Sequence, residues 1–248
     1  MKTNSFFFLF FAIAATALFS CTQDSSTLSP SPAAGQGGSM ARFAVSGDAL
    51  YTVDQAKLHV YNIAVPSNPH KEKEVQLGVG IETIFPFGDK LFIGSQTGMY
   101  IFDIRQQANP LLLSTYEHVV SCDPVVTDGR YAYLTLNAEN QCRGVNELHV
   151  IDLQNLSAPS LVKRYSMQSP QGVGIDGKHL FVCDRGLKLY DASDVNNLQL
   201  KQHLNISAYD VIPHNGHLLV VGKDGLYQYA YTQGTLEQLS KISVQPSL

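Results

Sequence analysis

The chain has 248 residues, of which 44% are hydrophobic and 15% are charged, and its net charge at pH 7 is −4. A mildly acidic chain without a basic stripe is not typical of proteins that bind nucleic acid or that adhere to anionic lipid headgroups. After the first twenty residues no apolar segment is long enough to cross a bilayer.

The N-terminal segment has the pattern of a secretory signal. Lys2 is followed by an apolar run from Phe6 to Phe19 that only Thr16 interrupts. This length suits a signal-peptide core and is shorter than the ~20 residues that span a membrane. The run ends in Leu18-Phe-Ser-Cys21, which resembles a bacterial lipobox. The resemblance implies a lipoprotein signal peptide over residues 1–20 and lipidation of Cys21; an ordinary secretory peptide with an incidental cysteine is the alternative.

Residues 21–40 are rich in Ser, Thr, Pro, Gly and Ala. Such a composition buries too little apolar surface to fold, so we interpret this segment as a flexible tether. The predicted partner of the N-terminus is a membrane, which the lipid anchor enters. The predicted location is the outer membrane, either on its periplasmic face or at the cell surface.

From residue 41 to residue 246 the chain repeats a short strand-like phrase five times. Steps of 41, 49, 39 and 39 residues separate the phrases Leu58–Asn62, Met99–Asp103, Leu148–Asp152, Leu187–Asp191 and Leu226–Ala230. All-strand repeats of ~40 residues are the pattern of a β-propeller, in which each repeat forms one four-stranded blade.

Each repeat contains the signals of four strands. A glycine lies between two apolar runs upstream of every phrase, at Gly47, Gly88, Gly129, Gly177 and Gly216. Runs of β-branched and aromatic residues around a glycine indicate a hairpin, and the phrase supplies the third strand. In three repeats a proline precedes a more polar fourth strand, as suits the exposed outer strand of a blade. The sequence therefore predicts an all-β, five-bladed propeller with no blade split between the termini.

The repeated Leu-x-Val-x-Asp strand followed by Asn-Pro resembles the LVIVD-repeat proteins, and more specifically the LVIVD-repeat lipoproteins of the Bacteroidetes type. The matching stretches are Ile81–Pro86, Ser121–Val126, Leu187–Ser193 and Tyr209–Pro213. Repeat 5 departs from the pattern, because its phrase ends in Ala230 and the Asn-Pro loop is missing. The resemblance implies a bacterial surface β-propeller and no particular reaction.

The cysteines after the anchor fall in two classes. Cys122 lies in the connection that enters blade 3, and Cys142 lies in the long insertion after the second strand of that blade. Propeller topology places both on the top face, so in an oxidising compartment we expect a disulfide between them. The alternative is a catalytic thiol at Cys122 with His118 as its base. Cys183, within an apolar run, is expected to be a small buried hydrophobe.

Counting six residues back from each turn glycine reaches the top of each innermost strand. The residues found there are Ala41, Glu82, Asp123, Gln171 and Asp210. Innermost strands line the central channel, so Glu82, Asp123, Gln171 and Asp210 form a candidate ligand site at one mouth. Three carboxylates that repel one another favour a hard cation such as Ca²⁺, with Glu82, Asp123 and Asp210 as ligands, or a basic group of a partner. A hydrated polar mouth without a ligand is the alternative.

The top loops add mixed polar residues: Asp54, Gln55, Gln96, Thr97, Arg143, Asp184, Arg185, Lys223 and Asp224. Loops on a rigid scaffold are where binding usually resides. His214 and His217 have a metal-like spacing but flank a tight turn, so we interpret them as turn residues. The sequence favours a binding module without catalytic residues, which presents its top face to an envelope protein, a glycan or a small ligand. A metal-assisted hydrolase or lyase that uses the channel acids is the alternative function, and a structural envelope protein is a third.

The anchor can be tested directly. Cys21→Ala removes the acceptor of the lipid, and each buried methylene of an acyl chain contributes ~0.8 kcal/mol to membrane binding. We expect the variant to move from the membrane fraction to the soluble periplasmic fraction. An unmodified, uncleaved N-terminus in mass spectra of the protein from its native host would contradict the anchor.

Overall fold

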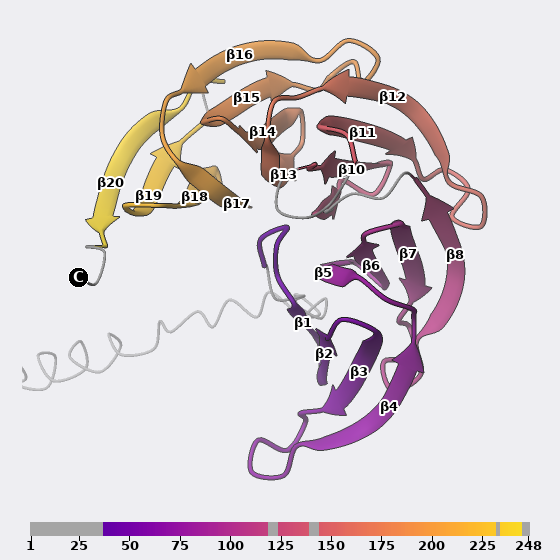
Figure 1. Cartoon of the computed structure of the whole chain (residues 1–248). Coiled ribbons are helices and arrows are strands. Elements are labelled where there is room, and N and C mark those ends of the chain that lie inside the picture. The colour runs from indigo at the N-terminus through magenta and orange to yellow at the C-terminus, as the bar shows by residue number, and fades with distance from the viewer. Residues whose placement is uncertain (1–36, 119–123, 139–143, 232–233, 245–248) are drawn as a thin grey trace, which may run out of the picture. The chain divides into compact units, whose positions relative to one another are not determined.

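Each predicted repeat folds into one four-stranded antiparallel sheet (Figure 1). The computed structural model describes residues 37–118, 124–138, 144–231 and 234–244, all within the unit Pro32–Leu248. Twenty strands and no helix occur in this described part. Strands within a sheet follow in chain order from the centre outward, so no blade is split between the ends of the chain. The predicted five-bladed β-propeller is confirmed.

The strands of the five blades have the following bounds. Blade 1 consists of β1 (Phe43–Ser46), β2 (Ala49–Val53), β3 (Lys57–Asn62) and β4 (His70–Gln76). Blade 2 consists of β5 (Ile81–Phe87), β6 (Lys90–Ser95), β7 (Gly98–Asp103) and β8 (Leu111–Glu117). Blade 3 consists of β9 (Val125–Thr127), β10 (Tyr131–Leu136), β11 (Glu147–Asp152) and β12 (Ser160–Ser166). Blade 4 consists of β13 (Pro170–Asp176), β14 (His179–Asp184), β15 (Leu187–Asp191) and β16 (Gln199–Leu204). Blade 5 consists of β17 (Ala208–His214), β18 (His217–Gly222), β19 (Gly225–Ala230) and β20 (Glu237–Ser243).

The turn glycines join the first and second strands of each blade, as predicted. Gly47 and Gly177 have φ angles of 56° and 54°, in the left-handed region where a side chain would be strained. Two-residue hairpins require such angles, because their twist must match that of the strands. The five phrases form the third strands β3, β7, β11, β15 and β19.

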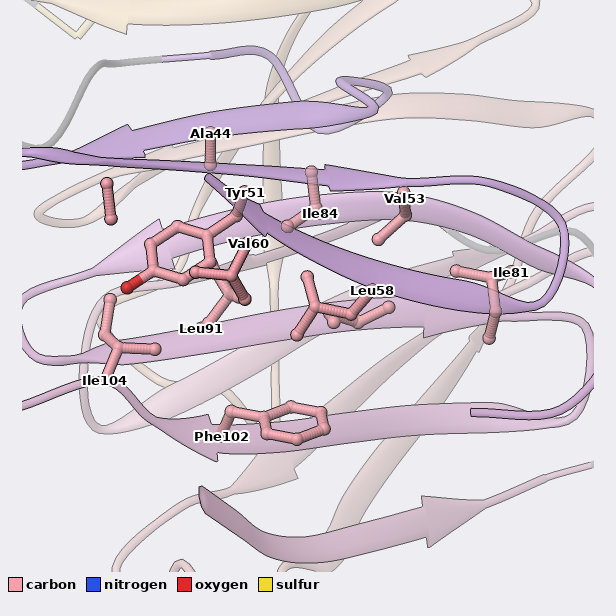
Figure 2. Close-up of a cluster of buried hydrophobic side chains, with 12 residues drawn as sticks. Ala44, Tyr51, Val53, Leu58, Val60, Ile81, Ile84, Leu91, Phe102 and Ile104 are labelled. Carbon is pink, nitrogen blue, oxygen red and sulfur yellow. The ribbon is translucent and has the colours of Figure 1, made fainter. Parts of the chain in front are cut away.

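Consecutive blades pack face to face through apolar side chains. We call the face of a blade that meets the next blade in the chain its forward face, and the opposite face its back face. Figure 2 shows the first of these seams, where Leu58 and Val60 of blade 1 lie near Ile84 and Phe102 of blade 2. All four side chains are at most 1% exposed. Similar clusters join blades 2 and 3, blades 3 and 4, and blades 4 and 5. Full burial of one such side chain is worth roughly 1.5–3 kcal/mol.

Within the described part of the chain, the two terminal faces of the stack have no blade packed against them. No cluster of buried side chains in the described part of the chain joins blade 5 to blade 1. On the forward face of blade 5, Val221 is 42% exposed and Ile242 is 64% exposed. Val53 occupies in blade 1 the position that Val221 occupies in blade 5, and it is only 7% exposed. On the back face of blade 1, Phe43 is 63% exposed. Both terminal faces therefore keep apolar residues without a neighbouring blade.

The covered and uncovered seams can be compared with one substitution. Leu58 and Leu226 begin the phrases of blades 1 and 5 at the same register position, but Leu58 is fully buried and Leu226 is half-buried. We expect Leu58→Ala to lower the free energy of unfolding by about 2–5 kcal/mol and Leu226→Ala to lower it by less than half as much. Denaturant unfolding of both variants measures this difference. Equal losses would mean that the forward face of blade 5 is covered in solution.

Candidate functional site

Three innermost strands carry a β-bulge at the same height. The pairing of β5 with β6 skips Glu82, the pairing of β13 with β14 skips Gln171 and Gly172, and the pairing of β17 with β18 skips Tyr209. A bulged residue leaves the ladder and its side chain is redirected, which is why bulges recur beside functional sites. Here the bulges direct Glu82, Gln171 and Tyr209 to one cavity.

This cavity, which we call the mouth cavity, has a volume of about 1020 Å³. It is bounded by inner strands and top hairpins of the blades, and the segment before β1 contributes Met40 and Arg42. Its other lining residues are Gln55, Ala56, Val79, Gly80, Ile81, Glu82, Thr83, Gln96, Pro124, Asn137, Pro170, Gln171 and Tyr209. A cavity of this size accommodates a ligand of several rings.

The polar lining of the mouth cavity is dominated by amides. Of the residues that the structure describes, Gln55, Gln96, Asn137 and Gln171 line it together with one cation, Arg42, and one acid, Glu82. Three of these side chains donate to neighbours: the Arg42 guanidinium to the carbonyl oxygen of Ile81 at 2.7 Å, the Gln96 amide to Glu82 Oε1 at 3.2 Å, and the Asn137 amide to the carbonyl oxygen of Pro170 at 2.6 Å. Amides donate and accept hydrogen bonds at once, so the lining matches ligands that also do both.

Asp210 does not line the mouth cavity, although the glycine count placed it there. The turn of blade 5 is Asn215-Gly216, with glycine in its second position, whereas blade 2 has Gly88-Asp89, with glycine in its first position. Counting back from the glycine therefore reaches one residue too far along β17. A slip of one residue moves a strand side chain to the opposite face. Tyr209 occupies the register position of Glu82, and aligning on the hairpin pairs instead of the glycines would have found it.

Asp210 instead ties the segment before β1 to the inner strands of blades 4 and 5. The Ser39 hydroxyl donates to Asp210 Oδ1 at 2.9 Å, and the Met40 amide donates to Oδ2 at 3.2 Å. The Ser39 oxygen in turn accepts from the amide of Val173 in β13 at 2.9 Å. Ser39 is fully buried, so the fold begins before Ala41, in residues that composition alone assigned to the tether. Burial raises the pKa of the Asp210 carboxyl, and the hydrogen bonds from Ser39, Val211 and Met40 oppose that rise.

Several predicted residues lie outside the described part of the chain: Cys21, Cys122, Asp123, Cys142 and Arg143. The anchor and the Cys122–Cys142 disulfide therefore stay predictions. Among the described residues no three His, Cys, Asp or Glu side chains are placed to hold a metal ion. Because Asp123 is one of the three predicted Ca²⁺ ligands, the metal site also stays a prediction.

Two smaller interpretations are confirmed. Cys183 is a free thiol, 1% exposed, and burial raises its pKa well above the ordinary value. It behaves as a small buried hydrophobe. His214 and His217 flank the turn between β17 and β18 and are both exposed.

Comparison with known proteins agrees with the fold. Residues 123–167 match the model of the LVIVD repeat. The chain therefore contains an LVIVD repeat at these residues. No curated protein matches its sequence. Among the described residues, none forms a helix of the length and apolarity that crossing a membrane requires.

Solved structures show the same architecture as this chain at low sequence identity. A protein from Lactobacillus plantarum has a TM-score of 0.65 and 17% identity, over 79% of this chain and 69% of that one. A functionally unknown protein from Desulfotomaculum acetoxidans has a TM-score of 0.66 and 10% identity, over 85% and 71%. A periplasmic gluconolactonase of Pseudomonas aeruginosa has a TM-score of 0.61 and 14% identity, over 80% and 68%. These likenesses establish the fold.

The buried Asp210 carboxyl predicts a pH dependence of stability. Because its pKa in the folded protein is raised, its contribution is complete below the unfolded-state pKa of ~4 and is lost as the pH rises through the folded value. Asp210→Asn removes this titration. We expect the stability of the wild type relative to the variant to fall as the pH rises from about 4 to about 8, measured by urea unfolding at each pH. A difference that stays constant over this range would contradict a raised pKa.

Proposed function

We propose that this protein is a lipid-anchored binding module of the cell envelope, and that its mouth cavity holds a saccharide. The observation that carries the proposal is the lining of this cavity, to which four amides and the exposed ring of Tyr209 contribute. Saccharide hydroxyls both donate and accept hydrogen bonds, as amides do, and the apolar face of a sugar packs on an aromatic ring. More broadly, the same face would bind a protein or another small ligand.

The bulges support this assignment because they place the three side chains on rigid strands. Gln171 and Tyr209 come from neighbouring blades, and Glu82 comes from the other side of the ring. Side chains on strands are held more firmly than side chains on loops, so less conformational entropy is lost when a ligand binds. The signal-like N-terminus and the lipobox-like Leu18–Cys21 support the anchor and the envelope location.

One observation favours an alternative, a hydrolase that acts on a sugar lactone. Glu82 is a carboxylate inside the cavity, and the fold is shared with a gluconolactonase at 14% identity. A metal at the channel mouth would polarise the lactone carbonyl, and Glu82 would be one of its ligands. Ring opening of gluconolactone, followed with and without added Ca²⁺, separates an enzyme from a binding module.

The binding module predicts a specific loss with Tyr209→Ala. The probe is a printed array of oligosaccharides, and the protein is the full chain carrying Cys21→Ala, which removes the predicted acceptor of the lipid. We expect binding of the recognised saccharide to weaken about tenfold or more, corresponding to ~1.4 kcal/mol or more, because the aromatic platform is lost.

Phe87→Ala is the matched control. Phe87 is 40% exposed, as Tyr209 is, but it lies at the opposite end of the strands in the β5–β6 hairpin. Its substitution should leave binding unchanged. Failure of the wild-type protein to bind any saccharide on the array, or equal losses in the two variants, would contradict the proposed function.

A further inference from the structure

A second cavity adjoins the mouth cavity above the seam between blades 4 and 5. Its volume is about 500 Å³, and it shares Gln171 and Tyr209 with the mouth cavity. We call it the side cavity. Its remaining lining residues are Ser169, Cys183, Arg185, Gly186, Asn205, Ile206, Ser207, Ala208 and Lys223. A ligand on Tyr209 therefore has access to both cavities.

Among the described residues, the side cavity is lined by two cations and by no acid. Arg185 lies in the β14–β15 hairpin and Lys223 lies in the β18–β19 hairpin. Among the described side chains neither has an ion-pair partner. The acids on the same two hairpins already form ion pairs. Lys188 Nζ lies 2.6 Å from Asp184 Oδ2, and Lys241 Nζ lies 2.6 Å from Asp224 Oδ2. The two hairpins therefore present uncompensated positive charge to the side cavity.

Arg185 is also held in an unfavourable backbone conformation. Its φ angle is 46°, and among the described residues other than glycine only Asn215 shares a positive φ. Asparagine tolerates this region because its short side chain forms local hydrogen bonds, whereas arginine has no such compensation. Strained residues cluster at functional sites, where the gain in function offsets the loss in stability. The strain and the free charge are independent observations, and both occur at Arg185.

We propose that the side cavity is an anion subsite and that the ligand of this protein is an acidic saccharide. Its sugar ring packs on Tyr209, and its carboxylate or sulfate group lies between the Arg185 guanidinium and the Lys223 ammonium. A guanidinium donates two parallel hydrogen bonds to such a group, and an ammonium adds a point charge. The proposal rests on the proposed saccharide-binding function and names the class of saccharide.

The test uses a printed array of neutral, uronate-bearing and sulfated oligosaccharides with the Cys21→Ala full chain. We expect binding to uronate-bearing or sulfated members, and the two groups on the array distinguish a carboxylate from a sulfate. For a uronate hit, methyl esterification of the carboxylate should weaken binding at least tenfold and should abolish its dependence on salt concentration.

Arg185→Asn separates function from structure. Asparagine holds a positive φ at position 215 of this same chain, so the variant should melt at or above the temperature of the wild type. Its affinity for the acidic probe should nevertheless fall at least tenfold, and Lys223→Gln should act in the same direction. Lys178→Gln is the control, because Lys178 is an exposed lysine in the β13–β14 hairpin at the opposite end of the strands.

The outcomes are distinguishable. Binding to neutral members alone, or an unchanged affinity in Arg185→Asn, overturns the anion subsite and leaves saccharide binding intact. Binding to no member of the array overturns both proposals. A fall in melting temperature of Arg185→Asn that accompanies the loss of affinity assigns Arg185 a structural role and overturns its role as a ligand contact.

Discussion

The apolar seam between consecutive blades is the constraint on which the rest of the structure depends. A sheet inside the stack is covered on both faces, so its third strand can bury apolar residues on both faces, whereas a half-exposed strand buries them on one. In β7 of blade 2, Met99, Ile101 and Phe102 are all at most 1% exposed, although Met99 and Ile101 lie on one face and Phe102 on the other. The seams fix the height of every blade relative to the next, and thereby the height of the bulges at the mouth.

The two terminal blades have a similar distribution of apolar residues to the inner blades, but within the described part of the chain only one face of each packs against another blade. Blade 5 keeps Val221 and Ile242 on its forward face, at positions that are buried or half-buried in blade 1, but it carries Gln228 where blade 1 carries Val60. Without an apolar seam at this place, the tie between the segment before β1 and blades 4 and 5 rests on Ser39 and Asp210. Met40 and Arg42 enter the mouth cavity directly after that tie. The arrangement of the cavity therefore depends on a few buried hydrogen bonds as well as on packing.

Much of the fold could be predicted from the sequence, because the same pattern of strands occurs in five repeats. The phrases, the turn glycines and the prolines each indicate the same strand boundaries. The site was less predictable, because it depends on single residues. Because the glycine stands second in the turn of blade 5, counting back from it predicted Asp210 in the cavity instead of Tyr209. Successive side chains of a strand point to opposite faces, so an error of one residue places the side chain on the wrong face. Ser39 had no signal at all: it lies in a Ser-rich, Gly-rich stretch and is recognised only by its burial. The strain at Arg185 is a backbone property that no side-chain pattern reports.

The acids of the top loops illustrate why a list of loop residues does not define a site. The second residue of a phrase extends toward the top edge of its blade and ends in a polar group, which must be paired where it is buried. His149 Nε2 lies 2.7 Å from Glu147 Oε2, and Lys188 Nζ lies 2.6 Å from Asp184 Oδ2. The Tyr227 hydroxyl donates to Asp224 Oδ1 at 2.5 Å. Burial alone would raise the pKa of Asp184, but Lys188 and the amides of Ser169 and Gln168 outweigh it and keep the carboxyl ionised.

The acids on the hairpins beside the side cavity thus pair within their own blades, whereas the neighbouring cations, Arg185 and Lys223, have no ion-pair partner among the described side chains. An acidic chain is therefore able to present a locally positive surface above blades 4 and 5, because the acids on these two hairpins are paired with lysines of their own blades while Arg185 and Lys223 line the cavity.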